Sequence, residues 1–138
     1  ACSAFLQRVE DGLLRGLTST VVLIEVLHRL MILEAVGSLR LHPRKATRYL
    51  KEHPEHVKSL HAHHRAPERI HQMGVEVVSV GLEEIERSQQ AKVRYGLLTN
   101  VALLVTSMQR GGLTALASND PDFDRVEGIA LYRPSPSG

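Results

Sequence analysis

The alternation of short apolar segments with longer segments of helical periodicity most constrains what this chain can fold into. The clearest apolar segment, residues 75–80, contains four valines and partly alternates with polar residues, as expected of a β-strand. Strands that alternate with helices favour a parallel sheet covered by helices on its faces. The pattern therefore predicts an α/β fold.

Apolar spacing and the positions of Gly and Pro predict the individual elements. Helices are expected over residues 5–13 with an end near Gly12, then up to Gly37, from Pro43 through Leu50, from Pro54 to Gly74, and over 82–94 and 99–110. Strands are expected over 17–20, 75–80, 113–117 and 129–132, with a turn or helical cap at 120–126. Pro67 should bend or break its helix. We expect one domain over residues 1–134, followed by a disordered tail at 135–138.

The cysteine content and the apolar stretches limit the cellular compartments expected for this protein. The chain has a single cysteine, Cys2, so no intrachain disulfide can form and nothing indicates an oxidising compartment. The longest strongly apolar stretch, residues 21–31, is interrupted by Glu25, His28 and Arg29 and is too short to cross a bilayer. A cytoplasmic protein without a membrane segment is the default expectation.

The formal net charge of +2 conceals a basic segment. Residues 40–71 contain eight Lys or Arg against three Glu, which makes this segment +5 and leaves −3 for the remainder. A basic stretch of this kind attracts phosphate, and the candidate RNA contacts are Arg40, Arg44, Lys45 and Arg48. The alternative is a solvated surface of two helices, because aromatic stacking residues are nearly absent from it.

Ligands of open parallel sheets lie beyond the carboxyl ends of the strands, so residues that follow strands are the candidates for chemistry. Three segments qualify. The first runs from Thr18 through Glu25 to Arg29, where a strand end leads into a helix that carries a carboxylate. The second is Leu98-Thr99-Asn100-Val101, where polar residues open an apolar helix and are expected to cap it. The third contains Ser118, Asn119, Asp120, Asp122 and Asp124.

In this order and spacing, the three segments resemble the PIN-domain family, and in particular the VapC-type toxins of VapBC toxin–antitoxin pairs. The resemblance covers essentially the whole chain and implies a three-layer PIN-like fold and a metal-dependent endoribonuclease. It implies that Glu25, Asp120 and Asp122 are catalytic ligands of Mg²⁺ or Mn²⁺, which prefer oxygen donors. Thr18, Asn100, Ser118 and Asn119 would line that site, and Asp120 could also cap a short helix. The implied partners are RNA, an antitoxin protein and a second copy of the chain in a homodimer.

The chain departs from the family pattern at two acidic positions. The family has an opening strand that ends in an Asp, and the sequence starts with the helix that follows such a strand. The family also has an acid after Thr-Asn, where this chain has Val101. With about half of the acidic positions left, metal affinity should be weak. A sheet without its central first strand should also expose two unpaired edges. We therefore expect an inactive nuclease, with a catalytically dead RNA- or protein-binding module as the alternative.

Overall fold

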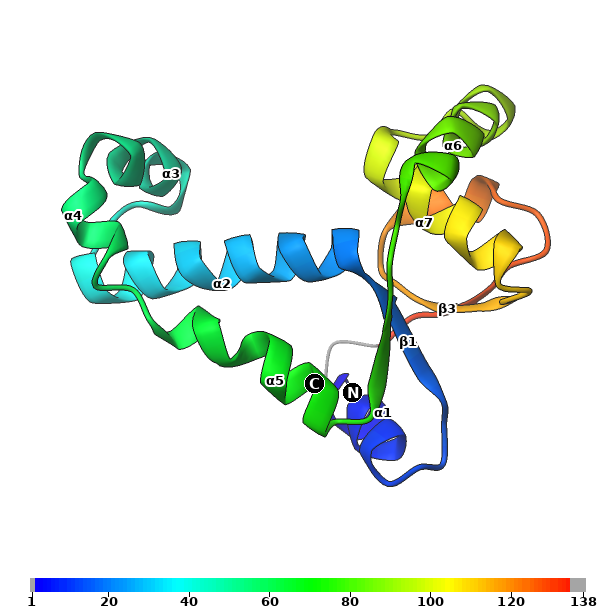
Figure 1. The fold of residues 1–138 in the computed structure, drawn as a ribbon, viewed down its shortest axis with the longest axis horizontal. Helices are drawn as coiled ribbons and strands as arrows, with labels where there is room; N and C mark the ends of the chain where they lie inside the picture. The colour runs from blue at the N-terminus through cyan, green and yellow to red at the C-terminus, as the bar shows by residue number, and fades with distance from the viewer. Residues whose placement is uncertain (1, 135–138) are drawn as a thin grey trace.

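The computed structural model describes residues 2–134, so the predicted tail at 135–138 lies outside the described residues. Figure 1 shows the arrangement of helices and strands. The elements in chain order are α1 (Cys2–Glu10), β1 (Gly16–Ser19), α2 (Thr20–Leu39), α3 (Pro43–Glu52), α4 (Pro54–Val57), the 3-10 helix η1 (Ala62–Arg65), α5 (Ala66–Gln72), β2 (Val75–Val78), α6 (Leu82–Tyr95), α7 (Thr99–Arg110), β3 (Ala115–Ala117), the 3-10 helix η2 (Pro121–Arg125) and β4 (Ala130–Tyr132). The predicted α/β class, with parallel strands flanked by helices, is confirmed.

The strands form two separate parallel pairs instead of the single sheet that we expected. β1 pairs with β2 from Gly16 opposite Val75 to Ser19 opposite Val78. β3 pairs with β4, with Leu116 opposite Leu131 at the centre. Within residues 2–134, no strand pairing joins β1 to β3. Among the described residues, β1 and β3 therefore each keep an edge without a ladder partner.

Helix α2 is the longest element and is mostly apolar, yet Ala35 is its only buried residue. Ser19 caps its N-terminus, because the Ser19 hydroxyl accepts a hydrogen bond from the amide of Val22 at 3.3 Å. The side chains of Ile24 and Leu33 are 66% and 65% exposed. In Figure 1, α2 extends from the end of β1 toward α3 and α4 at the far end of the molecule. The helix therefore presents apolar surface that the described part of the chain leaves exposed.

The segment from Pro54 to Gly74, expected as a helix that Pro67 bends or breaks, is instead interrupted before Pro67 and forms α4, η1 and α5. Its chain is turned onto α2 by Glu34, whose carboxylate accepts hydrogen bonds from the amides of His61 and Ala62 at 2.9 and 3.0 Å. Partial burial raises the pKa of Glu34, but these hydrogen bonds outweigh burial and hold the pKa below its ordinary value. Pro67 does not cause the break, because it lies in the first turn of α5, where its missing N–H is tolerated.

Two clusters of buried apolar residues are present in the described chain. One joins α6, α7 and η2, and its buried members are Ala91, Leu97, Ala102, Val105, Phe123 and Val126. The other joins α2 and α3 with the turn after α4, and its buried members are Ala35, Leu50 and Leu60. The first cluster anchors the helices that carry the second and third sequence segments of interest.

Candidate functional site

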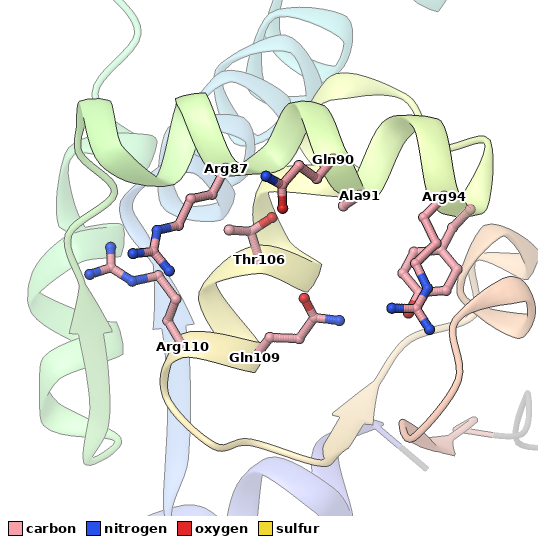
Figure 2. A pocket seen from close by; sticks show the side chains of 8 residues that line it. Arg87, Gln90, Ala91, Arg94, Thr106, Gln109 and Arg110 are labelled. Atoms are coloured by element: carbon pink, nitrogen blue, oxygen red, sulfur yellow. The ribbon is translucent and has the colours of Figure 1, made fainter.

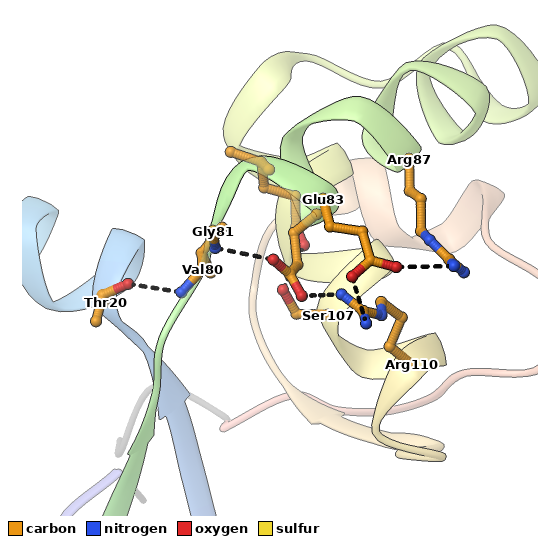
Figure 3. Close-up of polar contacts among 9 residues, drawn as sticks. Thr20, Val80, Gly81, Glu83, Arg87, Ser107 and Arg110 are labelled. Carbon is orange, nitrogen blue, oxygen red and sulfur yellow. Dashed lines mark hydrogen bonds and ion pairs between the residues drawn. The ribbon is translucent and has the colours of Figure 1, made fainter.

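The carboxyl ends of β1 and β2 are tied together by one hydrogen bond. The hydroxyl of Thr20, the first residue of α2, accepts from the amide of Val80 at 3.1 Å (Figure 3). Thr18, the expected site-lining residue, lies within β1 and is half-buried. The junction from β1 to α2 is thus well defined, and it fixes the helix on which Glu25 lies.

Glu25 lies in the second turn of α2 and is engaged by a neighbour on the same helix. Its Oε1 accepts from Nε and Nη2 of Arg29 at 3.1 and 3.0 Å. It lines an open hollow of about 410 Å³ with residues of α2 and with Thr47 of α3. Its side chain is 46% exposed, so the bond to Arg29 is a surface ion pair of small stabilising effect.

Two successive hydrogen bonds, each between residues two positions apart, hold the loop after β3. The Ser118 hydroxyl accepts from the amide of Asp120 at 3.1 Å, and Oδ1 of Asp120 accepts from the amide of Asp122 at 2.9 Å. Asp120 is therefore the cap of η2, with Pro121 at the first helical position, as expected from the sequence. Asn119 is exposed beside it. Asp122 forms an ion pair with Arg125 at 3.0 Å.

The start of α7 differs from the prediction that Thr99 or Asn100 caps it. The cap position is Leu98, which makes no side-chain capping bond, and its carbonyl accepts from the amide of Ala102 at 2.9 Å. Since the helix begins one residue earlier than a Thr99 cap would require, Thr99 and Asn100 lie inside its first turn. Val101 packs against the buried cluster of α6, α7 and η2. The position that carries an acid in the resembling family is thus apolar and partly buried.

The three candidate ligands are not gathered around one point in the described chain. Glu25 and Asp122 are each paired with an arginine, and Asp120 is used as a helix cap. No hydrogen bond joins Glu25 to either aspartate among the described residues. Nor does that part of the chain hold a group of three or more His, Cys, Asp or Glu side chains placed to bind a metal. We therefore assign no metal-dependent step to these residues.

The candidate RNA contacts lie around the end of α2 and along α3. Arg40 is the residue after α2 and adopts a left-handed conformation with φ 51. Arg44, Lys45 and Arg48 are exposed on α3, where Arg48 pairs with Glu52 at 2.8 Å. For Arg44 and Lys45, no salt bridge is present within residues 2–134. The four side chains are accessible, but no aromatic ring accompanies them on α3 other than the partly buried Tyr49.

Sequence reasoning missed a second surface that carries several arginines, the α6–α7 groove, which we define as the hollow of about 560 Å³ between these helices (Figure 2). Arg87, Gln90 and Arg94 line it from α6, and Thr106, Gln109 and Arg110 line it from α7. The spacing of residues 87, 90 and 94 places them on one helical face, which was the available signal. The sequence predicts only that residues 82–94 form a helix.

The model of the PIN domain family matches residues 2–129. No significant match is found among curated proteins or among solved structures. No helix within residues 2–134 combines the length and apolar character needed to cross a bilayer.

Proposed function

Because the chain belongs to the PIN domain family, whose members are typically nucleases, we propose that it has the architecture of a VapC-type endoribonuclease toxin and that this 138-residue polypeptide does not cleave RNA. PIN domains generally use divalent metal ions. The proposed metal is Mg²⁺ or Mn²⁺, held weakly, and the proposed setting is the cytoplasm, with an antitoxin protein as the regulatory partner.

The observation that carries the proposal is Val101. In the resembling toxins this position supplies an acid, whereas here a valine packs against the helical core. A valine donates no oxygen to a metal ion, and burying a carboxylate at the same place would require a compensating charge. The remaining candidate acids support the same reading, because Glu25 and Asp122 are neutralised by Arg29 and Arg125.

The proposed ligands and their neighbours divide into two groups on different elements. Glu25 lies on α2, downstream of Thr18, and Asp120 and Asp122 lie after β3, beside Ser118 and Asn119. Since β1 and β3 do not pair within the described chain, no ladder fixes one group against the other. A metal site shared by both groups requires the two strand pairs to be joined.

The test is cleavage of a mixed RNA pool in the presence of Mg²⁺ or Mn²⁺. We expect no cleavage by the 138-residue polypeptide and none by Val101→Asp alone, because the two strand pairs remain separate. Glu25→Gln is the control for contaminating nuclease. Robust cleavage by the parent that Glu25→Gln abolishes would contradict the inactive reading and make the chain an active member of the family.

A further inference from the structure

The α6–α7 groove is bounded by polar side chains that stand above a floor of small residues. Ser88 and Ala91 are buried on α6, and Ala102, Val105 and Thr106 are buried on α7, so the two helices approach closely there. Long side chains on their outer flanks rise beside this contact. Figure 2 shows Arg87 and Arg110 at one end of the groove, Arg94 at the other, and Gln90 and Gln109 between them.

One end of the groove is held by an ion-pair network. Arg110 pairs with Glu83 at 3.1 Å and also with Glu84, and Arg87 pairs with Glu83 at 2.9 Å (Figure 3). Glu84 in turn accepts from the amide of Gly81 at 2.8 Å, and this bond lowers the pKa of Glu84. These contacts orient the two guanidinium groups without filling the groove, since neither glutamate lines it.

At the other end, Arg94 is the least constrained cation. Its guanidinium lies 5.1 Å from the centre of the Tyr95 ring, and its only salt bridge among the described residues is a 3.4 Å contact with Glu127. Both partners of that pair are largely exposed, at 68% and 83%, so the contact holds Arg94 only weakly. Arg94 can therefore turn toward a ligand at small cost.

The groove offers hydrogen-bond donors to a negatively charged ligand. Each guanidinium has five N–H donors, and the ion pairs of Arg87 and Arg94 each engage one nitrogen. No side-chain hydrogen bond is found for Gln90 or Gln109 within residues 2–134, so their amides are available. No carboxylate lines the groove. Guanidinium and amide donors arranged around a hollow are the groups that bind phosphate.

We propose that the α6–α7 groove binds a nucleotide unit of single-stranded RNA through its phosphate. The groove volume of about 560 Å³ falls in the range of small-molecule sites and exceeds what a bare phosphate needs. The Arg94 side chain is 68% exposed, and a base can stack on the face of its guanidinium that is turned away from the Tyr95 ring. The inference rests on the proposed function and deepens it by adding an RNA contact made by residues other than the candidate acids, and it requires no metal and no cleavage.

The experiment is fluorescence anisotropy with a labelled single-stranded oligoribonucleotide in buffer containing EDTA, over a series of salt concentrations. Arg94→Gln should weaken binding about two- to fivefold, as expected for losing one exposed charge contact. It should also reduce the magnitude of the slope of log affinity against log salt by about 0.7, the contribution of one single-strand phosphate. The double variant Gln90→Ala/Gln109→Ala should weaken binding at every salt concentration without changing the slope.

Matched variants distinguish RNA binding in the groove from nonspecific attraction of RNA to positive charge elsewhere on the protein. Glu127→Gln removes the partner of Arg94 but keeps the guanidinium, so its binding should equal or exceed that of the parent. Arg8→Gln removes an exposed arginine of α1 and should have no effect on RNA binding beyond about twofold. Thermal melting of each variant checks that folding is retained. A free mononucleotide, used as competitor, should displace the oligonucleotide only at much higher concentration.

Three results would overturn the proposal. The first is unchanged affinity and salt slope in Arg94→Gln, and the second is loss of binding confined to Arg44→Gln/Lys45→Gln on α3. The third is equal affinity for the mononucleotide and the oligonucleotide, which would make the ligand a free nucleotide. None of these results depends on cleavage. RNA binding by the groove can therefore be disproved while the proposed nuclease architecture stands, and the nuclease architecture can be disproved while RNA binding by the groove stands.

Discussion

Arg40 combines a backbone conformation that disfavours its side chain with a place among the candidate RNA contacts. With φ 51 and ψ 41 it adopts the left-handed conformation that ends α2, and it is the only residue other than glycine with positive φ in the described chain. Glycine adopts this conformation without the clash that a Cβ causes. An arginine kept there at a cost in stability is consistent with a functional role for its side chain.

Arg40→Gly should therefore raise the free energy of unfolding by about 1 kcal/mol, because it removes the left-handed penalty. The matched variant Arg48→Gly, inside α3, should lower it by about 1 kcal/mol, because glycine is a poor helix former. Urea unfolding of both variants measures whether each substitution raises or lowers the free energy of unfolding. A loss of stability in Arg40→Gly would show that the arginine side chain stabilises the turn after α2.

Glu34 should make stability sensitive to acid. Its pKa is lowered from the ordinary value of 4.5 in the folded chain, so its stabilising contribution is complete above pH 4.5 and is lost as the pH falls through the lowered pKa. Glu34→Gln should unfold more easily near neutral pH and lose less stability on acidification than the parent. Urea midpoints measured across this pH range provide the test. The exposed Glu55→Gln should keep the parent's pH dependence, and identical profiles for both variants would refute the role of Glu34.

At the scale of the elements, Gly16 and Gly37 differ in how closely other atoms approach them. A Cβ added at Gly16, where β1 begins, would lie 2.7 Å from Cγ1 of the buried Val9 of α1. A Cβ added at Gly37, inside α2, would meet nothing within 4 Å. The first glycine allows close packing of α1 on β1, and the second has no such role.

Gly16→Ala should lower the free energy of unfolding by about 1–3 kcal/mol through overpacking against Val9. Gly37→Ala should raise it by about 0.5–1 kcal/mol, because alanine loses less entropy in a helix. Thermal or urea denaturation of the pair distinguishes these effects. Equal stabilisation by both substitutions would mean that α1 does not pack on the start of β1 as described.

Most element positions were predictable because their signals are local. Ser19 before an apolar helix and Gly12 after α1 mark boundaries that the chain itself encodes over a few residues. The turn between α4 and η1 was not predictable, since it depends on Glu34, which lies 27 residues before His61. The sequence predicted unpaired strand edges, but it did not predict that the strands separate into two pairs. The α6–α7 groove was missed because it requires knowing that α6 and α7 pack together.

At the scale of the whole molecule, α2 carries apolar surface that stays exposed among residues 2–134. Residues 21–31 and 101–108 are two apolar helical segments, but in α7 most of the apolar residues are buried within the chain. On α2, Ile24 remains 66% exposed. We propose that α2 forms the homodimer interface, because an exposed apolar face of this kind is typical of protein contacts.

Light scattering after size exclusion should give the mass of a dimer at micromolar concentration. Ile24→Glu should shift the mass toward the monomer, since it places a charge in the proposed interface. Val93→Glu, at a position on α6 that is 89% exposed, should leave the dimer intact. A strictly monomeric parent chain at micromolar concentration and above would contradict the proposed dimer.

The central claim is that the chain has the architecture of a VapC-type nuclease but does not cleave RNA as a 138-residue polypeptide. Joining the two strand pairs tests this claim most directly. Adding a family-like strand that ends in Asp, together with Val101→Asp, should allow β1 and β3 to pair through it and bring the two groups of acids to one sheet edge. The measurement is cleavage of a mixed RNA pool with Mg²⁺ or Mn²⁺ by the parent, by Val101→Asp and by the fully repaired chain. We predict cleavage by the repaired chain alone, abolished by Glu25→Gln. A repaired chain that folds and remains silent would contradict the nuclease architecture and favour a binding module.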